Sequence, residues 1–438
     1  MREDSSKPAL EASQAAPRTL GEIGLSLEDL IRRGARDLLQ GAVEAELAEM
    51  LAVFAQVRLL DGRRAVVRNG HLPEREILTG VGPVAVEVPK VRDRSGNGIK
   101  FNSTLVPPYV RRSARVAAAL PWLYLKGISS GDLGEALRVL VGEAAQGLSP
   151  AALSRLKAQW GEDYQAWTRR SLVDQTYAYW WVDGIYTPLR GSEDPRLCLL
   201  VIIGVRRDGT KEWVAISDGL RESTESWLDV LRGLKARGLQ AGPRLAVGDG
   251  ALGFWGALEQ VYPDTVHQRC WFHKLGNLLN ALPKTWQAKA KADLQAIWMA
   301  PTLAEARRAC DRFIARYQAK YPKATEKLVK DRDALLAFYA FPAEHWVHLR
   351  TTNPIESTFA TLRHRTTRTK NCVTRTTFLG LAFKLAEEAA KSWRRITAPK
   401  KVMELLGGTR YENGVEVLDP PPEARQQQEQ HEEQRLAA

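Results

Sequence analysis

The sequence predicts an α/β core that is interrupted by an all-α insertion and preceded by a mainly α-helical region with a small β-hairpin unit. Three observations predict this fold class. Strand-like runs dominate residues 176–219, helical periodicity takes over between 275 and 346, and both patterns occur before residue 173. A chain of 438 residues is long enough for more than one domain.

The N-terminal part is predicted to combine a helix with a hairpin. Residues 1–20 lack the order of a signal peptide and are expected to be a disordered lead-in. Within residues 21–109, apolar residues at three- and four-residue spacing predict a helix from Leu27 to about Ala55. Residues 66–94 then alternate Val or Ile with polar residues around Asn-Gly and Gly-Pro turns, which predicts the β-hairpin unit.

Residues 110–172 are predicted to form a helical, helix-turn-helix-like region. Gly147 is expected to end a first helix, and Ser149 to cap a second helix with Pro150 in its first turn. The second helix carries Arg155 and Lys157, which can contact phosphates or base edges in DNA. A short helical hairpin packed in a bundle would show the same pattern, so both interpretations stay open.

Residues 173–274 are predicted to be the first part of the core. Three β-rich runs cover 176–189, 196–209 and 211–219, an amphipathic helix covers 223–239, and two more strands cover 244–250 and 264–273. The middle run contains Leu-Leu-Val-Ile-Ile, which suits a strand covered on both faces. Three strands, a helix and two further strands follow a ribonuclease-H-like order.

The remaining chain is predicted to be helical up to its tail. In the all-α insertion, residues 275–346, Thr302 and Glu305 form a capping box, and Pro322 separates two helices. Residues 347–400 are expected to supply the final helices of the core. Residues 401–438 form a C-terminal tail that is mostly disordered, because its end is rich in Pro and Gln.

The charge distribution favours a polyanionic partner. The formal net charge is +12, and Lys or Arg side chains that neutralise phosphates release bound counterions. Residues 357–386 contain no Asp or Glu. A solvated helix face usually mixes both signs, so we interpret this basic strip as phosphate-contacting. Its cations are Arg363, Arg365, Arg368, Lys370, Arg375 and Lys384.

Cysteine spacing and hydropathy indicate the compartment. The four cysteines, Cys198, Cys270, Cys310 and Cys372, are far apart and support no disulfide framework. A reducing cytoplasm therefore fits best. No run of about 18 apolar residues is present, so a soluble protein without a membrane span is expected.

Two aspartates follow apolar, strand-like runs. Asp183 comes after Tyr-Trp-Trp-Val at the expected end of a strand, where burying a carboxylate is costly unless it meets a cation. Asp183-Gly184 is also a common turn dipeptide. Asp249 follows Leu-Ala-Val-Gly in the same manner.

The residues around Asp249 also match a dinucleotide-binding motif. Gly248, Gly250 and Gly253 have GxGxxG spacing between a predicted strand and a helix. However, Asp249 would place a negative charge against the pyrophosphate, and the expected acid about 20 residues later is replaced by the basic run His267-Gln268-Arg269. We therefore reject a dinucleotide site.

Glu356 has two explanations. Asn353 is expected to be an N-cap, Pro354 the first helical residue, and Glu356 the residue that closes a capping box. The same helix face also carries Arg363, which suits a metal-binding carboxylate followed by a phosphate-binding cation. Together with two Asp at strand ends, Glu356 could hold two Mg²⁺ ions, which take oxygen ligands and promote phosphoryl transfer.

Other acids compete for these roles. Asp208 lies in a predicted hairpin turn and Asp229 on an amphipathic helix, so both are expected at the surface, whereas Asp218 is the most serious rival. Cys270 and His273 have the spacing of half a zinc site, but no second pair fits. A His in such a position is more often a satisfied polar group near a strand end. Beside a metal–carboxylate centre, His273 could instead orient a scissile phosphate.

These motifs together resemble the mutator-type transposases of bacterial insertion sequences. The resemblance covers about residues 20–400 and rests on motifs in their order: Leu125–Ser129, Val182–Gly184, Gly248–Gly250, Cys270-x-x-His273 and Thr352–Ser357. It implies a D-D-E catalytic triad of Asp183, Asp249 and Glu356 that binds two Mg²⁺, for which Mn²⁺ can substitute. It also implies a ribonuclease-H-like fold with a helical insertion. Cys270, His273 and Asn353 are expected at the active-site margin.

The resemblance also implies partners and a reaction. The expected substrates are double-stranded DNA with terminal inverted repeats and a target DNA, with cleavage followed by strand transfer. We expect a homodimer or larger assembly on DNA and a cytoplasmic, nucleoid-associated protein without membrane contact. Two alternatives remain: a nuclease of the same fold that does not transfer strands, and a catalytically silent, transposase-derived DNA-binding protein.

Overall fold

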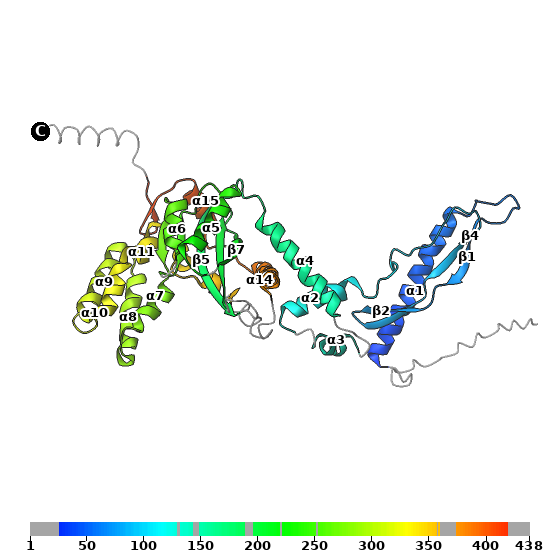
Figure 1. The fold of residues 1–438 in the computed structure, drawn as a ribbon, viewed down its shortest axis with the longest axis horizontal. Helices are drawn as coiled ribbons and strands as arrows, with labels where there is room; N and C mark the ends of the chain where they lie inside the picture. Colours follow the sequence, from blue (N-terminus) through cyan, green and yellow to red (C-terminus); the bar gives the residue numbers. More distant parts are fainter. Residues whose placement is uncertain are drawn as a thin grey trace, which may run out of the picture. The chain divides into compact units, whose positions relative to one another are not determined.

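The computed structural model describes residues 26–128, 132–142, 149–188, 196–219, 221–250, 253–356, 358–359 and 374–418. The chain divides into two compact units, the first ending at Leu153 and the second beginning at Ser154 (Figure 1). Within the described stretches, no helix is long and apolar enough to cross a membrane. The predicted lead-in and the Pro- and Gln-rich end of the tail lie outside the described residues.

The first unit is built on the predicted N-terminal helix, α1 (Leu27–Val53). The Ser26 side chain caps α1 by accepting a hydrogen bond from the Asp29 N–H at 3.1 Å. The predicted hairpin unit is confirmed as two antiparallel pairs, and Val43 of α1 packs against the apolar side chains of its inner pair. The inner pair is β2 (Arg75–Thr79) with β3 (Gly82–Val86), and the outer pair is β1 (Val66–His71) with β4 (Pro89–Asp93).

Three helices follow, namely α2 (Ala114–Leu125), α3 (Leu133–Val141) and α4 (Pro150–Thr168). The predicted end of the first helix at Gly147 is wrong for α3. Gly142, with φ of 97°, ends α3 earlier by taking a conformation that side chains disfavour. Gly147 itself lies outside the described residues. The predicted start of the next helix is confirmed, because Ser149 Oγ accepts from the Ala152 N–H at 3.2 Å.

The second unit contains one mixed sheet of five strands in the order β7-β6-β5-β8-β9. The first three strands are antiparallel, whereas β8 runs parallel to β5 and β9 runs parallel to β8. The predicted order of strands is confirmed, but the last predicted strand is too long. Cys270 caps helix α7, so residues 271–273 are helical. The strands are β5 (Tyr177–Pro188), β6 (Arg196–Arg206), β7 (Lys211–Gly219), β8 (Leu245–Gly248) and β9 (Val266–Arg269).

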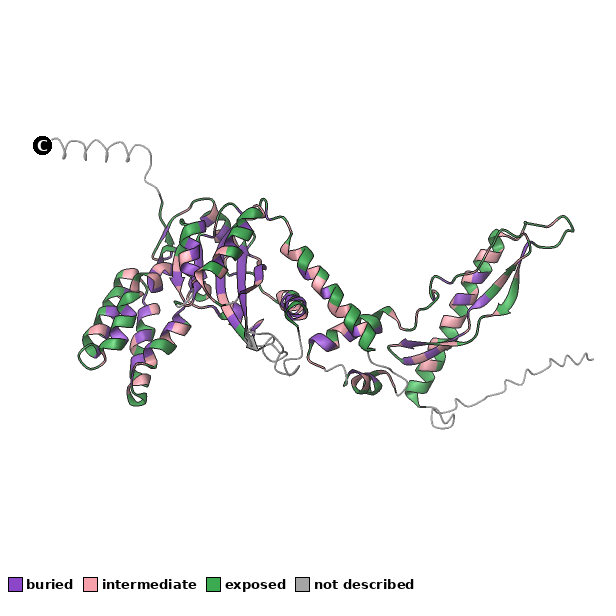
Figure 2. Cartoon of the chain, in the orientation of Figure 1, coloured by how far each residue is buried: buried purple, intermediate pink, exposed green. Residues whose placement is uncertain are grey.

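Helices cover both faces of this sheet. On one face, α5 (Thr224–Ala236) and α6 (Phe254–Val261) pack their apolar side chains against Trp180, Val182 and Ile202 of the strands. On β7, α14 (Arg375–Ala390) packs so that Trp213 Nε1 donates to the Ala386 carbonyl at 2.8 Å. The sheet is therefore the buried centre of the unit, as the burial colouring shows (Figure 2).

Between β9 and the late helices lies a wholly helical segment, as predicted for the insertion. Thr302 caps α9 through a hydrogen bond from the Glu305 N–H at 3.3 Å, and Pro322 begins α10. The helices are α7 (Trp271–Leu279), α8 (Lys284–Trp298), α9 (Leu303–Tyr317), α10 (Pro322–Lys330), α11 (Arg332–Leu336) and α12 (Trp346–Leu349), with two short 3₁₀ turns at Ala337–Ala340 and Ala343–His345.

The segment that the sequence assigned to a C-terminal tail begins with ordered structure. Helix α15 (Pro399–Leu406) buries Val402 and Leu405, and the short strands β10 (Tyr411–Glu412) and β11 (Val415–Glu416) pair with each other. Tyr411 is buried as well. These few apolar residues anchor the segment although its composition is mostly polar.

Candidate active site

Asp183 and Asp249 lie side by side on neighbouring parallel strands. Trp181 of β5 is in register with Val247 of β8, and each aspartate follows two residues later. The prediction that Asp249 follows a strand directly is confirmed, because β8 ends at Gly248. The prediction that Asp183 ends its strand is wrong. β5 continues to Pro188 and Asp183 pairs with Val201 of β6, so Asp183-Gly184 is extended strand and not a turn.

The carboxylate of each aspartate accepts a hydrogen bond from the N–H of the glycine that follows it. Asp183 Oδ1 accepts from the Gly184 N–H at 2.9 Å, and Asp249 Oδ1 accepts from the Gly250 N–H in the same way. In addition, Trp255 Nε1 donates to the Asp249 carbonyl at 2.7 Å. The second carboxylate oxygen of each aspartate takes no part in these bonds to the following glycines.

Glu222 is an acidic member of this site that the sequence reasoning missed. Its carboxylate occupies the space where a side chain on Gly184 would stand, so residue 184 must be glycine for Glu222 to lie there. Glu222 precedes the Ser223 N-cap of α5 and looks like an ordinary residue before a helix. The one signal in the sequence was its position three residues after the third predicted β-rich run, which ends at Gly219.

Glu356 lies on a short helix that begins at Asn353, one residue earlier than predicted. The prediction that Asn353 is the N-cap is wrong, because the Thr352 carbonyl accepts the first helical bonds, from Ile355 and Glu356. Asn353 is exposed. The buried Thr352 hydroxyl donates to Glu356 Oε1 at 3.3 Å, so this carboxylate is held by threonine and not by the predicted capping box.

The Cys270-x-x-His273 element joins the second aspartate to the glutamate. The Cys270 N–H donates to the Gly248 carbonyl at 2.9 Å, next to Asp249. The Cys270 sulfur accepts from the Thr352 N–H at 3.4 Å. His273 Nε2 lies 3.7 Å from Glu356 Oε1. This strand-to-helix junction therefore braces two segments that are far apart in the sequence.

The site concentrates negative charge around one imidazole. Pairing with the Cys270 thiol raises the pKa of His273 to about 9 against the opposing effect of burial, and the charges of Asp249 and Asp183 contribute. Burial opposes ionisation of Cys270, but hydrogen bonds with His273 and Thr352 outweigh it and lower the thiol pKa. His273 is thus a cation at neutral pH among several carboxylates.

The same surroundings that favour the charged form of His273 favour the neutral form of Glu222. Burial, together with the neighbouring Asp183 and Asp249 carboxylates, raises the pKa of Glu222 to about 7, against the lowering effect of His273. The Glu222 side chain therefore holds a proton in the folded protein at pH values where it is ionised in the unfolded chain.

This pKa predicts how stability depends on pH in the metal-free protein. Because the folded-state pKa of Glu222 is above its ordinary 4.5, its contribution to stability is present below pH 4.5 and is lost as pH rises towards 7. After allowance for solvent screening, the loss is on the order of 1–2 kcal/mol. Urea unfolding in EDTA at pH 5 and pH 7.5 measures it, with E222Q as the comparison. Parallel pH dependence in E222Q and the unmodified protein would contradict this expectation.

The rival aspartates lie elsewhere. Asp208 accepts hydrogen bonds from Thr210 in an exposed turn, and Asp229 is exposed on α5, as predicted. Asp218, the most serious rival, forms an ion pair with Arg375. That pair accounts for the Asp218 carboxylate without any role in the acidic site.

Only some of the predicted DNA-contacting cations lie within the described residues. Arg155 and Lys157 lie on α4, where Arg155 is exposed and Lys157 is half-buried. Arg375, at the start of α14, is engaged by Asp218. Lys384 is paired with Asp163 and Glu387, each at 2.8 Å. The remaining predicted cations, Arg363, Arg365, Arg368 and Lys370, lie outside the described residues.

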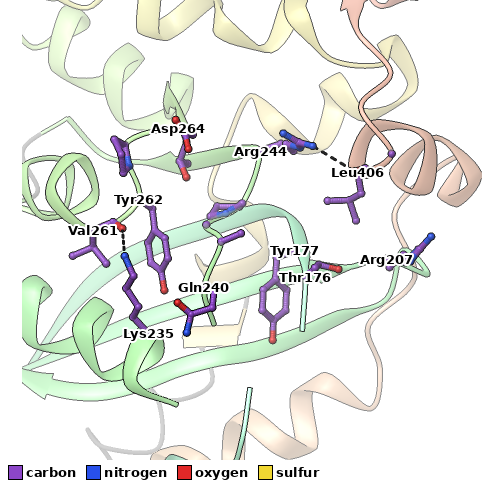
Figure 3. A pocket seen from close by; sticks show the side chains of 16 residues that line it. Thr176, Tyr177, Arg207, Lys235, Gln240, Arg244, Val261, Tyr262, Asp264 and Leu406 are labelled. Carbon is purple, nitrogen blue, oxygen red and sulfur yellow. Dashed lines mark hydrogen bonds between the residues drawn. The ribbon is translucent and has the colours of Figure 1, made fainter. Parts of the chain in front are cut away.

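A separate cavity of about 480 Å³ lies at the opposite end of the parallel strands, where β5 and β8 begin (Figure 3). Two of its cations already bond to backbone carbonyls: Lys235 to Val261 at 3.4 Å and Arg244 to Leu406 at 3.4 Å. Since strands β5 and β8 run parallel, this cavity is at the wrong end of the sheet to include Asp183 or Asp249.

The fold and the site define an α/β protein that gathers acidic side chains where the pairing of the parallel strands β5 and β8 ends. Comparison with known proteins identifies the family. The model of the Mutator family of transposases matches residues 7–396, and the chain belongs to this family.

Relatives named as insertion-sequence transposases support this membership. The transposase for element IST2 of Acidithiobacillus ferrooxidans is 58% identical over 288 residues, which are 64% of this chain and 95% of that protein. The transposase for IS6120 of Mycolicibacterium smegmatis is 50% identical over 68% of this chain and 92% of its own length. The transposase for ISRM5 of Rhizobium meliloti is 29% identical over 87% and 92%. Membership supports a function in transposition, and transposases cleave DNA and transfer strands.

Proposed function

We propose that this protein is a D-D-E transposase in which Asp183, Asp249 and Glu356 bind two Mg²⁺ ions on a ribonuclease-H-like core. One observation carries the proposal. The register of β5 with β8 brings the two aspartates together, and the Cys270 brace ties the Glu356 helix to the end of β8. The strand order β7-β6-β5-β8-β9, with three antiparallel and two parallel strands, supports the proposed core.

The chemical type of the proposed ligand side chains suits Mg²⁺. All three proposed ligands offer carboxylate oxygens, the donors that this hard cation prefers, and their mutual repulsion would be relieved by a divalent charge. Within the part of the chain that the structure describes, no three His, Cys, Asp or Glu side chains are close enough together to enclose an ion. We therefore infer that the Glu356 side chain moves towards the aspartates when metal binds. Mn²⁺ is expected to substitute for Mg²⁺.

The bound ions would supply activation of the attacking oxygen and stabilisation of the leaving oxygen in phosphoryl transfer. The chain itself performs the other tasks. The cationic His273, 3.7 Å from Glu356, is suited to orient the scissile phosphate beside the acids. Thr352 and Cys270 hold the Glu356 helix in place, so the third ligand starts from a fixed backbone position.

The substrate would be double-stranded DNA, both the terminal inverted repeats of an insertion sequence and a target duplex. The exposed Arg155, with Lys157 on the same helix, is a candidate for phosphate contact, as is the basic strip of residues 357–386. Two element ends must be cut and joined, so we expect a homodimer or larger assembly on DNA.

A strand-transfer assay tests the proposal. The protein is incubated with Mg²⁺, a target plasmid and a labelled duplex that ends in the element's inverted repeat. We expect cleavage at the repeat and joined products, both abolished by EDTA and restored by Mn²⁺. Cleavage without joining would indicate a nuclease that lacks strand transfer, and binding alone would indicate a silent DNA-binding protein; either result overturns the proposal.

A further inference from the structure

Asp331, at the junction of α10 and α11 in the helical insertion, lies between two buried cations. It forms an ion pair with Lys274, and its Oδ1 is 4.0 Å from Arg269 Nε. The three side chains are only 10–16% exposed. Asp331 also reaches the active site, because its Oδ2 would be 3.5 Å from a side-chain carbon placed on Gly250.

Arg269 connects Asp331 to the catalytic segment through an aromatic ring. The Arg269 guanidinium stacks on Trp255, 4.2 Å from the ring centroid. Trp255 in turn donates its indole N–H to the Asp249 carbonyl at 2.7 Å. A continuous path of contacts therefore runs from Asp331 through Arg269 and Trp255 to Asp249.

Arg269 depends on Asp331 for electrostatic compensation. Its Nε and Nη1 atoms are buried and make no hydrogen bond within the described structure. Burial lowers the pKa of Arg269, and the charges of Asp331 and then Asp249 oppose that effect. If Asp331 were neutral, Asp249 and then Glu259 would be the carboxylates that still act on this guanidinium, and the attraction of Arg269 would compete with metal for Asp249.

The insertion is firmly attached at this point. Gln268 Nε2 and Trp271 Nε1 both donate to the Leu335 carbonyl, at 3.0 and 2.9 Å, and the Phe338 N–H donates to Gln268 Oε1 at 2.8 Å. Gln268 and Trp271 flank Arg269 in the sequence. Asp331 is therefore held in a fixed position relative to the end of β9.

We propose that Asp331 is a positioning residue through which the helical insertion keeps Asp249 available for catalysis. The inference rests on the proposed catalytic role of Asp249. Asp331 occupies Arg269 and Lys274 and leaves the Asp249 carboxylate free of them, while the stacked Trp255 fixes the Asp249 backbone. Loss of Asp331 should weaken metal binding and slow the chemical step without weakening the binding of DNA.

The test uses the full chain with D331N, W255F and the double variant. W255F keeps an aromatic ring for Arg269 but removes the N–H that holds Asp249. Each single variant is expected to lower kcat for cleavage about tenfold and to raise the Mn²⁺ Kd, measured by electron paramagnetic resonance without DNA, by a similar factor, with KM for DNA unchanged. Because both residues act on one path, the double variant should lose about tenfold and not about a hundredfold.

D333N is the matched control. Asp333 lies on α11, two residues after Asp331, and pairs with Arg307, but its side chain is 80% exposed, so its loss should leave both Mn²⁺ affinity and kcat unchanged. An unchanged Mn²⁺ affinity in D331N, or additive losses in the double variant, would overturn the inference. D249N distinguishes a failure of the proposed function from a failure of this inference. If D249N still binds Mn²⁺ and cleaves DNA, the proposed function is wrong. If D249N is inactive and D331N is unaffected, only the role of Asp331 is refuted.

Discussion

Replacing Asp249 by Asn is expected to abolish both DNA cleavage and strand transfer while DNA binding is retained. Asn has the same size and can keep the hydrogen bond from the Gly250 N–H, so the backbone after β8 should not change. What disappears is one negative charge at the point where β5 and β8 end their pairing. We expect a loss of at least about 10²–10³-fold, the effect of removing one electrostatic stabiliser of a transition state.

D183N is expected to behave in the same way, because Asp183 occupies the equivalent level on β5. Single-turnover cleavage of a labelled repeat duplex measures the chemical step, and a gel-shift titration measures DNA binding. D229N is a suitable control, since Asp229 is exposed on α5. Wild-type cleavage rates in D249N, or loss of DNA binding in parallel with cleavage, would refute a direct catalytic role.

The sequence was sufficient to predict the strands of the core and its two aspartates. Apolar runs such as Leu-Leu-Val-Ile-Ile identify buried strands without knowledge of their partners, since burial on both faces leaves no polar alternation. Asp183 and Asp249 stand out because an acid beside such a run is costly to bury. The predicted β-rich run over residues 176–189 agrees with β5, but the prediction that Asp183 ends the strand is wrong, because the pairing of Asp183 with Val201 of β6 is a long-range contact.

The parts of the site that sequence reasoning missed depend on long-range contacts. Cys270 meets Thr352 across 82 residues, and Asp331 meets Lys274 across 57 residues. No local pattern encodes such pairs, since each residue has an ordinary role within its own helix or strand. Glu222 was missed for the same reason: only the folded sheet shows that Gly184 leaves space for its carboxylate.

The third acid gives the second large effect, and the comparison of E356Q with D218N decides its identity. E356Q keeps the hydrogen bond from the Thr352 hydroxyl but removes the charge next to His273. We expect cleavage to fall by at least about 10²-fold, as for other groups that stabilise charge in the transition state. Single-turnover cleavage at saturating DNA, with Mg²⁺ varied, measures the loss.

D218N should leave the chemical step unchanged, because the Asp218 carboxylate is paired with Arg375 away from the acids. The variant releases the Arg375 guanidinium, so DNA binding should become tighter at low salt and more sensitive to added salt. An active E356Q beside an inactive D218N would assign the third ligand to Asp218. If Asp218 were the ligand, the Asp218–Arg375 ion pair would have to open for catalysis, and R375Q should raise the activity. If Glu356 is the ligand, R375Q should only weaken the binding of DNA.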